Sequence, residues 1–190
     1  SGQMALTGFA TQGGDASYEF DGHVNMPLID EKLAFRATGF YAHHGGWVDN
    51  VLGPDLTSNE AFSSKYPAAT TNAGVAEDNF NIWEIKGGRL AALWNASDDV
   101  NVLFNATGQW EGTTGSWETD PHLGDDRITK FYDEYRDDNW WQGGMTITAD
   151  LGFAELKAAS SYLSREMNYQ WDNMTYEQWK TSYYGGPDAL

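Results

Sequence analysis

Two adjacent histidines are the first residues in this sequence whose types could do chemistry. His43 and His44 lie shortly before Asp49, and imidazole nitrogens and carboxylate oxygens are common ligands of zinc. Successive side chains of a strand point to opposite faces, so two adjacent rings cannot bind one ion without a bulge. We therefore predict no metal site here, and nothing else in the sequence indicates a cofactor.

A second candidate is the acidic stretch 111–138, which contains nine acidic and three basic residues, a net charge of −6. It lacks the ligand spacing of a calcium-binding loop. Asp133/Glu134 or Asp137/Asp138 could serve as glycosidase acid and base only if the carboxyl groups faced each other across a cleft at a set separation. We expect a solvated loop and assign no catalytic residue.

Aromatic residues make up 15% of the chain, and several lie in or beside polar segments. They could stack on a ligand such as a sugar or an aromatic chelator, because aromatic faces offer large contact area at little entropic cost. They could instead pack the loops together and meet a lipid interface, which is the interpretation we favour. The cluster comprises Trp47, Trp117, Phe131, Tyr132, Tyr135 and Trp140. Our candidate ligand-binding residues are Trp47, Trp117, Tyr132 and Trp140.

The elements that position these residues are strands, because apolar and polar residues alternate with a period of two. In 100–111 the apolar set includes Val102 and Phe104, and the polar set includes Asn105 and Thr107. The same alternation predicts seven strands, at roughly 4–11, 18–28, 33–43, 82–95, 100–111, 140–151 and 154–166.

The lengths of the connections favour one fold class. Short turns are expected near 28–32, 96–99 and 152–153, and long loops at roughly 44–81, 112–138 and 167–190. Short turns at one end and long loops at the other are typical of outer-membrane barrels, whereas Greek-key sandwiches mix loop lengths at both ends. We predict an all-β, antiparallel, up-and-down transmembrane β-barrel segment, with the three long loops together on one side.

The composition argues against one class of partner and one kind of covalent framework. With 11 basic and 28 acidic residues the net charge is −17, which argues against nucleic acid as a partner. There is no cysteine, so no disulfide framework is expected. The chain starts at Ser1 without a leader, so we expect a mature piece or a fragment of something longer.

Four segments, in this order, resemble the start of the barrel of the TonB-dependent outer-membrane receptors: 18–36 (YEFDGHVNMPLIDEKLAFR), 45–50 (GGWVDN), 87–94 (GGRLAALW) and 150–156 (DLGFAEL). The resemblance implies a barrel of 22 strands around a plug domain. Residues 1–190 would be a partial outer-membrane β-barrel domain, with the plug and the later strands outside this sequence. Such a segment cannot close alone, so its two edges should pair with more protein.

The resemblance also implies a function. The receptor would bind a scarce nutrient, a ferric siderophore or similar chelate, or cobalamin or a glycan, and pass it across the outer membrane of a Gram-negative bacterium without acting as an enzyme. Implied partners are membrane lipid and lipopolysaccharide, the plug and remaining barrel strands, the TonB complex acting through the plug, and the small-molecule ligand. Arg36 and Arg89 on the lumen face would contact the plug or an anionic ligand. The alternative is a secreted, aromatic-rich β-sandwich that binds carbohydrate, in which the apolar faces would pair into one core.

Overall fold

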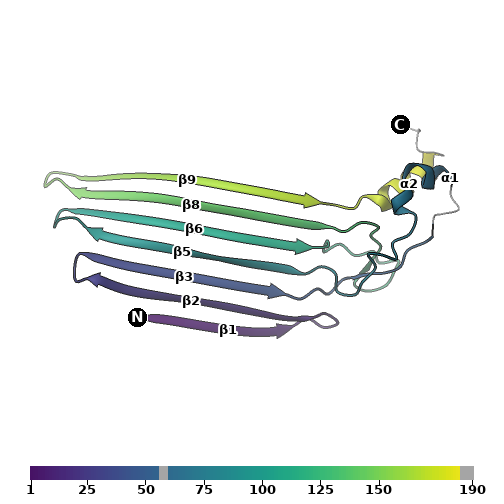
Figure 1. Ribbon diagram of the computed structural model, residues 1–190, viewed down its shortest axis with the longest axis horizontal. Coiled ribbons are helices and arrows are strands. Elements are labelled where there is room, and N and C mark those ends of the chain that lie inside the picture. The colour runs from purple at the N-terminus through teal and green to yellow at the C-terminus, as the bar shows by residue number, and fades with distance from the viewer. Residues whose placement is uncertain (56–59, 185–190) are drawn as a thin grey trace.

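The computed structural model describes residues 1–55 and 60–184, without the side chains of 60–62 and 181–184. Seven strands form one antiparallel sheet in the order β1-β2-β3-β5-β6-β8-β9, each beside its sequence neighbour in the sheet (Figure 1). The expected seven-stranded, up-and-down arrangement is therefore confirmed. The sheet is not closed into a barrel, since β1 and β9 are its two free edges. The strands are β1 (Gly2–Ala10), β2 (Ala16–Ile29), β3 (Leu33–His44), β5 (Trp83–Asn95), β6 (Val100–Thr114), β8 (Tyr135–Asp150) and β9 (Glu155–Gln170).

The pairing register separates an apolar from a polar face. Val102 pairs with Ile147 and Phe104 with Met145, and directly paired residues of an antiparallel sheet share a face. The alternating residues, Asn105, Thr107, Thr146 and Thr148, lie on the other face. The expected division between the two sets of side chains is confirmed. We call the face of Phe104 the apolar face and the face of Thr107 the polar face.

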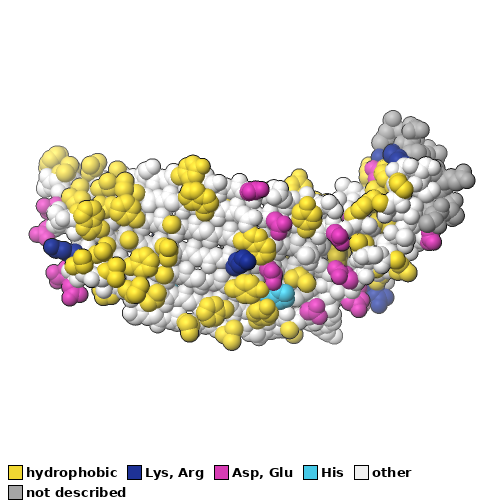
Figure 2. Space-filling model, in the orientation of Figure 1, with side chains coloured by type: hydrophobic (Ala, Val, Ile, Leu, Met, Phe, Trp, Pro, Cys, Tyr) yellow, Lys and Arg dark blue, Asp and Glu magenta, His cyan; other side chains and the backbone are white. Residues whose placement is uncertain are grey.

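Nothing in the described part of the chain forms a second layer over the apolar face. Phe104 is 45% exposed, Leu90 51% and Trp94 47%. In Figure 2 hydrophobic side chains gather over the part of the sheet next to the short turns, and acidic side chains lie nearer the loops and at the outer edge of the short turns. The buried hydrophobic clusters lie mainly in the long connections, around Val48, Phe80 and Ile128 and around Ala69 and Phe131.

Three strands extend further toward the long loops than the sequence indicates. β6 continues to Thr114 rather than 111, β8 begins at Tyr135 rather than 140, and β9 continues to Gln170 rather than 166. Pairing is unbroken over this extension, from Glu111 with Asp138 to Thr114 with Tyr135. The alternation is hidden there because both faces carry polar residues.

The long connections contain short helices and strands that the sequence analysis did not predict. They contain β4 (Asp49–Asn50), α1 (Glu60–Lys65), the 3-10 helix η1 (Pro67–Ala69), β7 (Arg127–Ile128) and α2 (Met174–Tyr184). Residues 56–59 of the first expected loop and 185–190 of the third lie outside the described residues. No helix in the described ranges is long and apolar enough to cross a membrane.

The three long connections meet at one end of the sheet (Figure 1). β4 and β7 pair in parallel, joining the first connection to the second. The Tyr66 hydroxyl donates a hydrogen bond of 2.7 Å to Glu177, which joins the first to the third. The connection of residues 11–15 lies at this end too, although it is short, and the Asp15 N–H donates to the Gly46 carbonyl at 2.9 Å.

Candidate functional site

The floor of the candidate site is one row of residues that crosses the polar face at the loop end of the sheet. Phe9 pairs with Ser17, His44 with Trp83, Trp83 with Thr113 and Thr113 with Arg136. The register therefore aligns side chains from six strands that are far apart in the sequence. We call this set the loop-end row: Phe9, Ser17, His44, Trp83, Thr113 and Arg136.

Aromatic rings form one half of the loop-end row. The His44 ring lies edge-on to Phe9, with 5.2 Å between centroids, and edge-on to Trp83, with 4.5 Å between centroids. Edge-to-face packing places the positive edge of one ring against the negative face of the next. These contacts hold the Trp83 indole in place beside the polar half of the row.

Three carboxylates on the polar face form hydrogen bonds to side chains of the loop-end row. Each lies two residues nearer the short turns than the row. Glu19 bonds to His44 Nε2 at 2.9 Å, and Glu111 accepts a hydrogen bond of 3.1 Å from Trp83 Nε1. Asp138 accepts one of 3.2 Å from Arg136 and a bidentate pair from Arg165. Glu111 forms no ion pair within the described residues, whereas Asp138 is compensated by two guanidinium groups.

The long connections form the roof of the site, and buried side chains fix their position. Asn81 Oδ1 accepts hydrogen bonds of 2.7 Å from the N–H groups of both Trp47 and Val48. The Gly115 N–H donates to the Glu134 carbonyl at 2.9 Å. Such bonds satisfy backbone groups that a loop would otherwise leave unpaired, so the loop aromatics sit on a defined scaffold.

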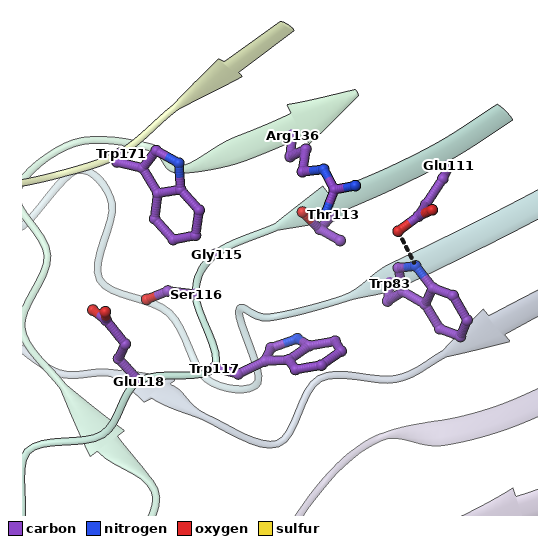
Figure 3. Close-up of a pocket in the computed structure, with 9 residues that line it drawn as sticks. All are labelled: Trp83, Glu111, Thr113, Gly115, Ser116, Trp117, Glu118, Arg136 and Trp171. Carbon is purple, nitrogen blue, oxygen red and sulfur yellow. Dashed lines mark hydrogen bonds between the residues drawn. The ribbon is translucent and has the colours of Figure 1, made fainter. Parts of the chain in front are cut away.

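Two recesses lie between the floor and the roof. The first, of about 420 Å³, is lined from the sheet by Trp83, Glu111, Thr113 and Arg136, and from the connections by Gly115, Ser116, Trp117, Glu118 and Trp171. Figure 3 shows the three indoles around this recess, with the bond between Trp83 and Glu111 at one side. The second, of about 340 Å³, shares Trp83 and Trp117 with the first and adds Phe9, Thr11, Ser17, His44, Gly45, Trp47 and Asn81.

Of the four aromatic residues predicted to bind a ligand, the structure brings two together. Trp47 and Trp117 both line the second recess, and Trp117 is 62% exposed. Tyr132 packs against the cluster of Ala69 and Phe131, which matches the loop-packing alternative. Trp140 lies on the polar face, paired with Gln109 and Arg165, and lines neither recess.

Arg36 and Arg89 lie on the polar face, where the sequence placed them. Arg36 pairs with Ala91, two positions along β5 from Arg89, so the two guanidinium groups are diagonal neighbours. Both residues are exposed, and no ion pair of either is found among the described side chains. Their partner, plug or ligand, stays a prediction.

The histidines lie on opposite faces, as the alternation requires. His43 Nδ1 bonds to Glu84 at 3.0 Å on the apolar face, and His44 bonds to Glu19 on the polar face. No group of three metal-binding side chains occurs in the described ranges.

The two carboxylates of each candidate glycosidase pair lie in different surroundings. Glu134 is buried and paired with Lys130 at 2.8 Å, while Asp133 is exposed. Asp137 and Asp138, adjacent in β8, lie on opposite faces.

Sequence reasoning missed most of the residues of the recesses. Trp83 and Glu111 fall within predicted strands but were not singled out as site residues, whereas Arg136 lies in the part of β8 that was not predicted and Trp171 follows the missed end of β9. Their common signal is the alternation along each strand: every residue of the loop-end row lies an even number of residues from the other polar-face residues of its strand. Once the register is known, this alternation places the residues of the row together.

Comparison with known proteins does not assign the chain to a family. No protein-family model, no curated protein and no solved structure matches the chain.

Proposed function

We propose that this chain forms part of the barrel wall of a TonB-dependent outer-membrane receptor that takes up a scarce nutrient. The observation that carries the proposal is a single sheet of seven long strands with an uncovered apolar face and a polar face. In water such a face needs a second layer. In a barrel wall the hydrocarbon of the membrane covers it, and the polar face lines the lumen.

The dimensions of the apolar face support the proposal. From residue 100 to residue 110 there are ten steps of about 3.3 Å, which at a tilt of about 45° span about 24 Å. The apolar band of such barrels is about 25 Å high. Trp94 lies near the short turns, and Trp110 and Trp141 lie nearer the loops, where interfacial aromatic girdles would fall.

The charged side chains of the apolar face support an outer membrane boundary at the height of the tryptophans nearer the loops. Lys86 lies over the Trp110 ring, 4.6 Å from its centroid, and it pairs with Tyr41 in the neighbouring strand. Glu84 and Asp137, on the same face, lie still closer to the loops. Charged side chains on a lipid face are costly at the midplane and tolerated at the interface, so they fit an outer boundary near Trp110.

The alternative, a secreted β-sandwich, is less well supported. It requires the apolar face to pack on another sheet, and the only other sheet in the described ranges is the two-residue pair β4–β7. The two free edges at β1 and β9 also expose unpaired backbone groups, which more strands of the same barrel would pair.

Cysteine labelling tests the proposed topology directly, because the chain contains no cysteine of its own. Asp125→Cys lies in the second long connection and Ala96→Cys in a short turn, and both positions are exposed. In the full-length protein, in a Gram-negative host, a membrane-impermeant maleimide should label position 125 on intact cells and position 96 only after lysis. Equal labelling of both positions on intact cells, or recovery of the protein outside the outer membrane, would contradict the proposal.

A further inference from the structure

The two recesses share chemistry that the proposed function leaves open, and three of their lining residues carry unpaired polar atoms. Ser116 is 3% exposed and its Oγ has no hydrogen-bond partner among the described residues; the same holds for the Nδ2 of Asn81, which is 2% exposed. Arg136 Nε is a third unpaired buried donor. A buried polar group without a partner is costly, and a ligand rich in hydroxyl groups would supply partners in both recesses.

The charges of the first recess disfavour an anionic ligand. Arg136 and Arg165 share Asp138, and Glu118 and Glu134 share Lys130, so the residual charges of these two groups are opposite and cancel. Among the described residues, the Trp83 indole is the only hydrogen-bond partner of Glu111, and the Glu111 carboxylate would repel an anion. The chain as a whole carries −17, which acts in the same direction.

The unpaired donors also disfavour a simple organic cation. An indole cage beside a carboxylate can bind a quaternary ammonium group. Such a group has no acceptor for the Arg136 N–H and no donor or acceptor for the Ser116 hydroxyl. Sugar hydroxyls both donate and accept, and the C–H face of a pyranose ring stacks on an indole.

The shape of the site indicates more than one ring. Trp83 and Trp117 belong to both recesses, so the two volumes adjoin, and together their lining residues run across the loop end of the sheet from β1 to β8. Trp171 lies at one side of the site, and Trp47 lies at the other with the edge-to-face pair of Phe9 and His44. Successive aromatic surfaces along an elongated site suit successive sugar units.

We propose that this site binds a neutral oligosaccharide, with sugar rings on Trp171, Trp117 and Trp47 and hydroxyl groups bonded to Ser116, Glu111 and Arg136. The assignment names the substrate class of the site and rests on the proposed function for its placement at the mouth of the lumen. The recess geometry is independent of that placement, so the two can fail separately.

The test uses the full-length protein purified in a polyoxyethylene ether detergent, since the headgroup of an alkyl glycoside would compete for the site. The probes are neutral gluco-, manno-, galacto- and xylo-configured hexasaccharides, with hexagalacturonate, ferric citrate and choline as charged comparators. We expect one or more of the neutral series to bind, and to bind more tightly than every comparator, by titration calorimetry. Failure of all the neutral probes, or tighter binding of a charged one, overturns the proposal.

Substitutions locate the binding. Trp117→Ala should weaken the neutral oligosaccharide roughly tenfold, and Trp117→Phe, which keeps an aromatic face, by clearly less. Trp141→Ala is the matched control, because Trp141 is similarly exposed but lies on the apolar face. If Trp117→Ala does not assemble, Trp171→Ala takes its place. Unchanged affinity in the assembled variant overturns the site.

The outcomes separate the two proposals. Correct labelling at position 125 together with binding of ferric citrate alone would retain the receptor and reject the oligosaccharide. Labelling on both sides together with Trp117-dependent oligosaccharide binding would retain the site and reject the barrel.

Discussion

Asn50 and Lys130, 80 residues apart in the sequence, bind each other through two hydrogen bonds. The Lys130 N–H donates to Asn50 Oδ1 at 2.8 Å, and Asn50 Nδ2 donates to the Lys130 carbonyl at 3.2 Å. The same Nδ2 donates to the Val75 carbonyl at 2.8 Å. One buried amide therefore joins the first and second long connections beside β4 and β7, and this junction supports the roof over the two recesses.

Asn50→Ala should loosen both long connections while leaving the seven-stranded sheet intact. The substitution leaves a buried N–H and two carbonyls without partners, which costs about 1–3 kcal/mol. Hydrogen exchange of residues 45–55 and 126–134 should accelerate, and that of β6 should not. Asn101→Ala, at an exposed position in β6, is the control. Equal protection in the two variants would show that Asn50 does not hold the connections together.

Gly46→Ala should displace the segment that carries Trp47. A Cβ at Gly46 would lie 1.8 Å from the Asn79 carbonyl oxygen, a backbone atom that cannot swing away. Overpacking of this kind costs about 1–3 kcal/mol or more, and here it would open the contact between 45–48 and 79–81. Gly74→Ala is the matched control, because nothing lies within 4 Å of the added methyl group. Urea unfolding of the long connections, followed by tryptophan fluorescence, should therefore occur at a lower urea concentration in Gly46→Ala than in Gly74→Ala.

The docking of α2 should depend on pH through Glu177. The hydrogen bond from Tyr66 and, secondly, that from Lys180 hold the pKa of Glu177 below its ordinary value. Because the folded-state pKa is lowered, the contribution to stability is complete above the ordinary glutamate pKa of about 4.3 and is lost as pH falls through the folded-state value. Hydrogen exchange of residues 174–180 should show weaker protection at pH 3 than at pH 7. In Glu177→Gln this part of the pH dependence should disappear, and a response as large as that of the wild type would refute it.

The sheet could be predicted from the sequence because its period-two signal is strong where only one face is polar. Strand β6 is such a case, with Val102 and Phe104 on the apolar face and Asn105 and Thr107 on the polar face. The signal fails at the loop end, where Thr113 in β6 and Asp138 in β8 lie beyond the predicted strands and polar residues occur on both faces. There only the partner strand reveals the structure.

The site could be predicted only in part, for a related reason. Exposed tryptophans such as Trp47 and Trp117 stand out in polar segments, but the sequence does not distinguish them from Tyr132, which packs into the cluster of Ala69 and Phe131. The difference lies in long-range contacts such as Asn81 with Trp47. Composition and periodicity contain no information about those contacts.

Two adjacent residues of β8 offer the sharpest test of which face meets lipid. Ile147 lies on the apolar face, paired with Val102 and Ala158, and Thr146 lies on the polar face, paired with Leu103 and Ala159. An arginine on the lipid face near the midplane costs about 2–4 kcal/mol, and one on the lumen face avoids the hydrocarbon. In the full-length protein folded into lipid vesicles, Ile147→Arg should therefore lower the free energy of unfolding by about that amount, and Thr146→Arg by much less. The two substitutions add the same side chain one residue apart in one strand, so the intrinsic strand propensity of arginine contributes equally to both. Equal destabilisation by both, or a larger effect at Thr146, would mean that the apolar face packs against protein or that the sheet is inverted in the membrane.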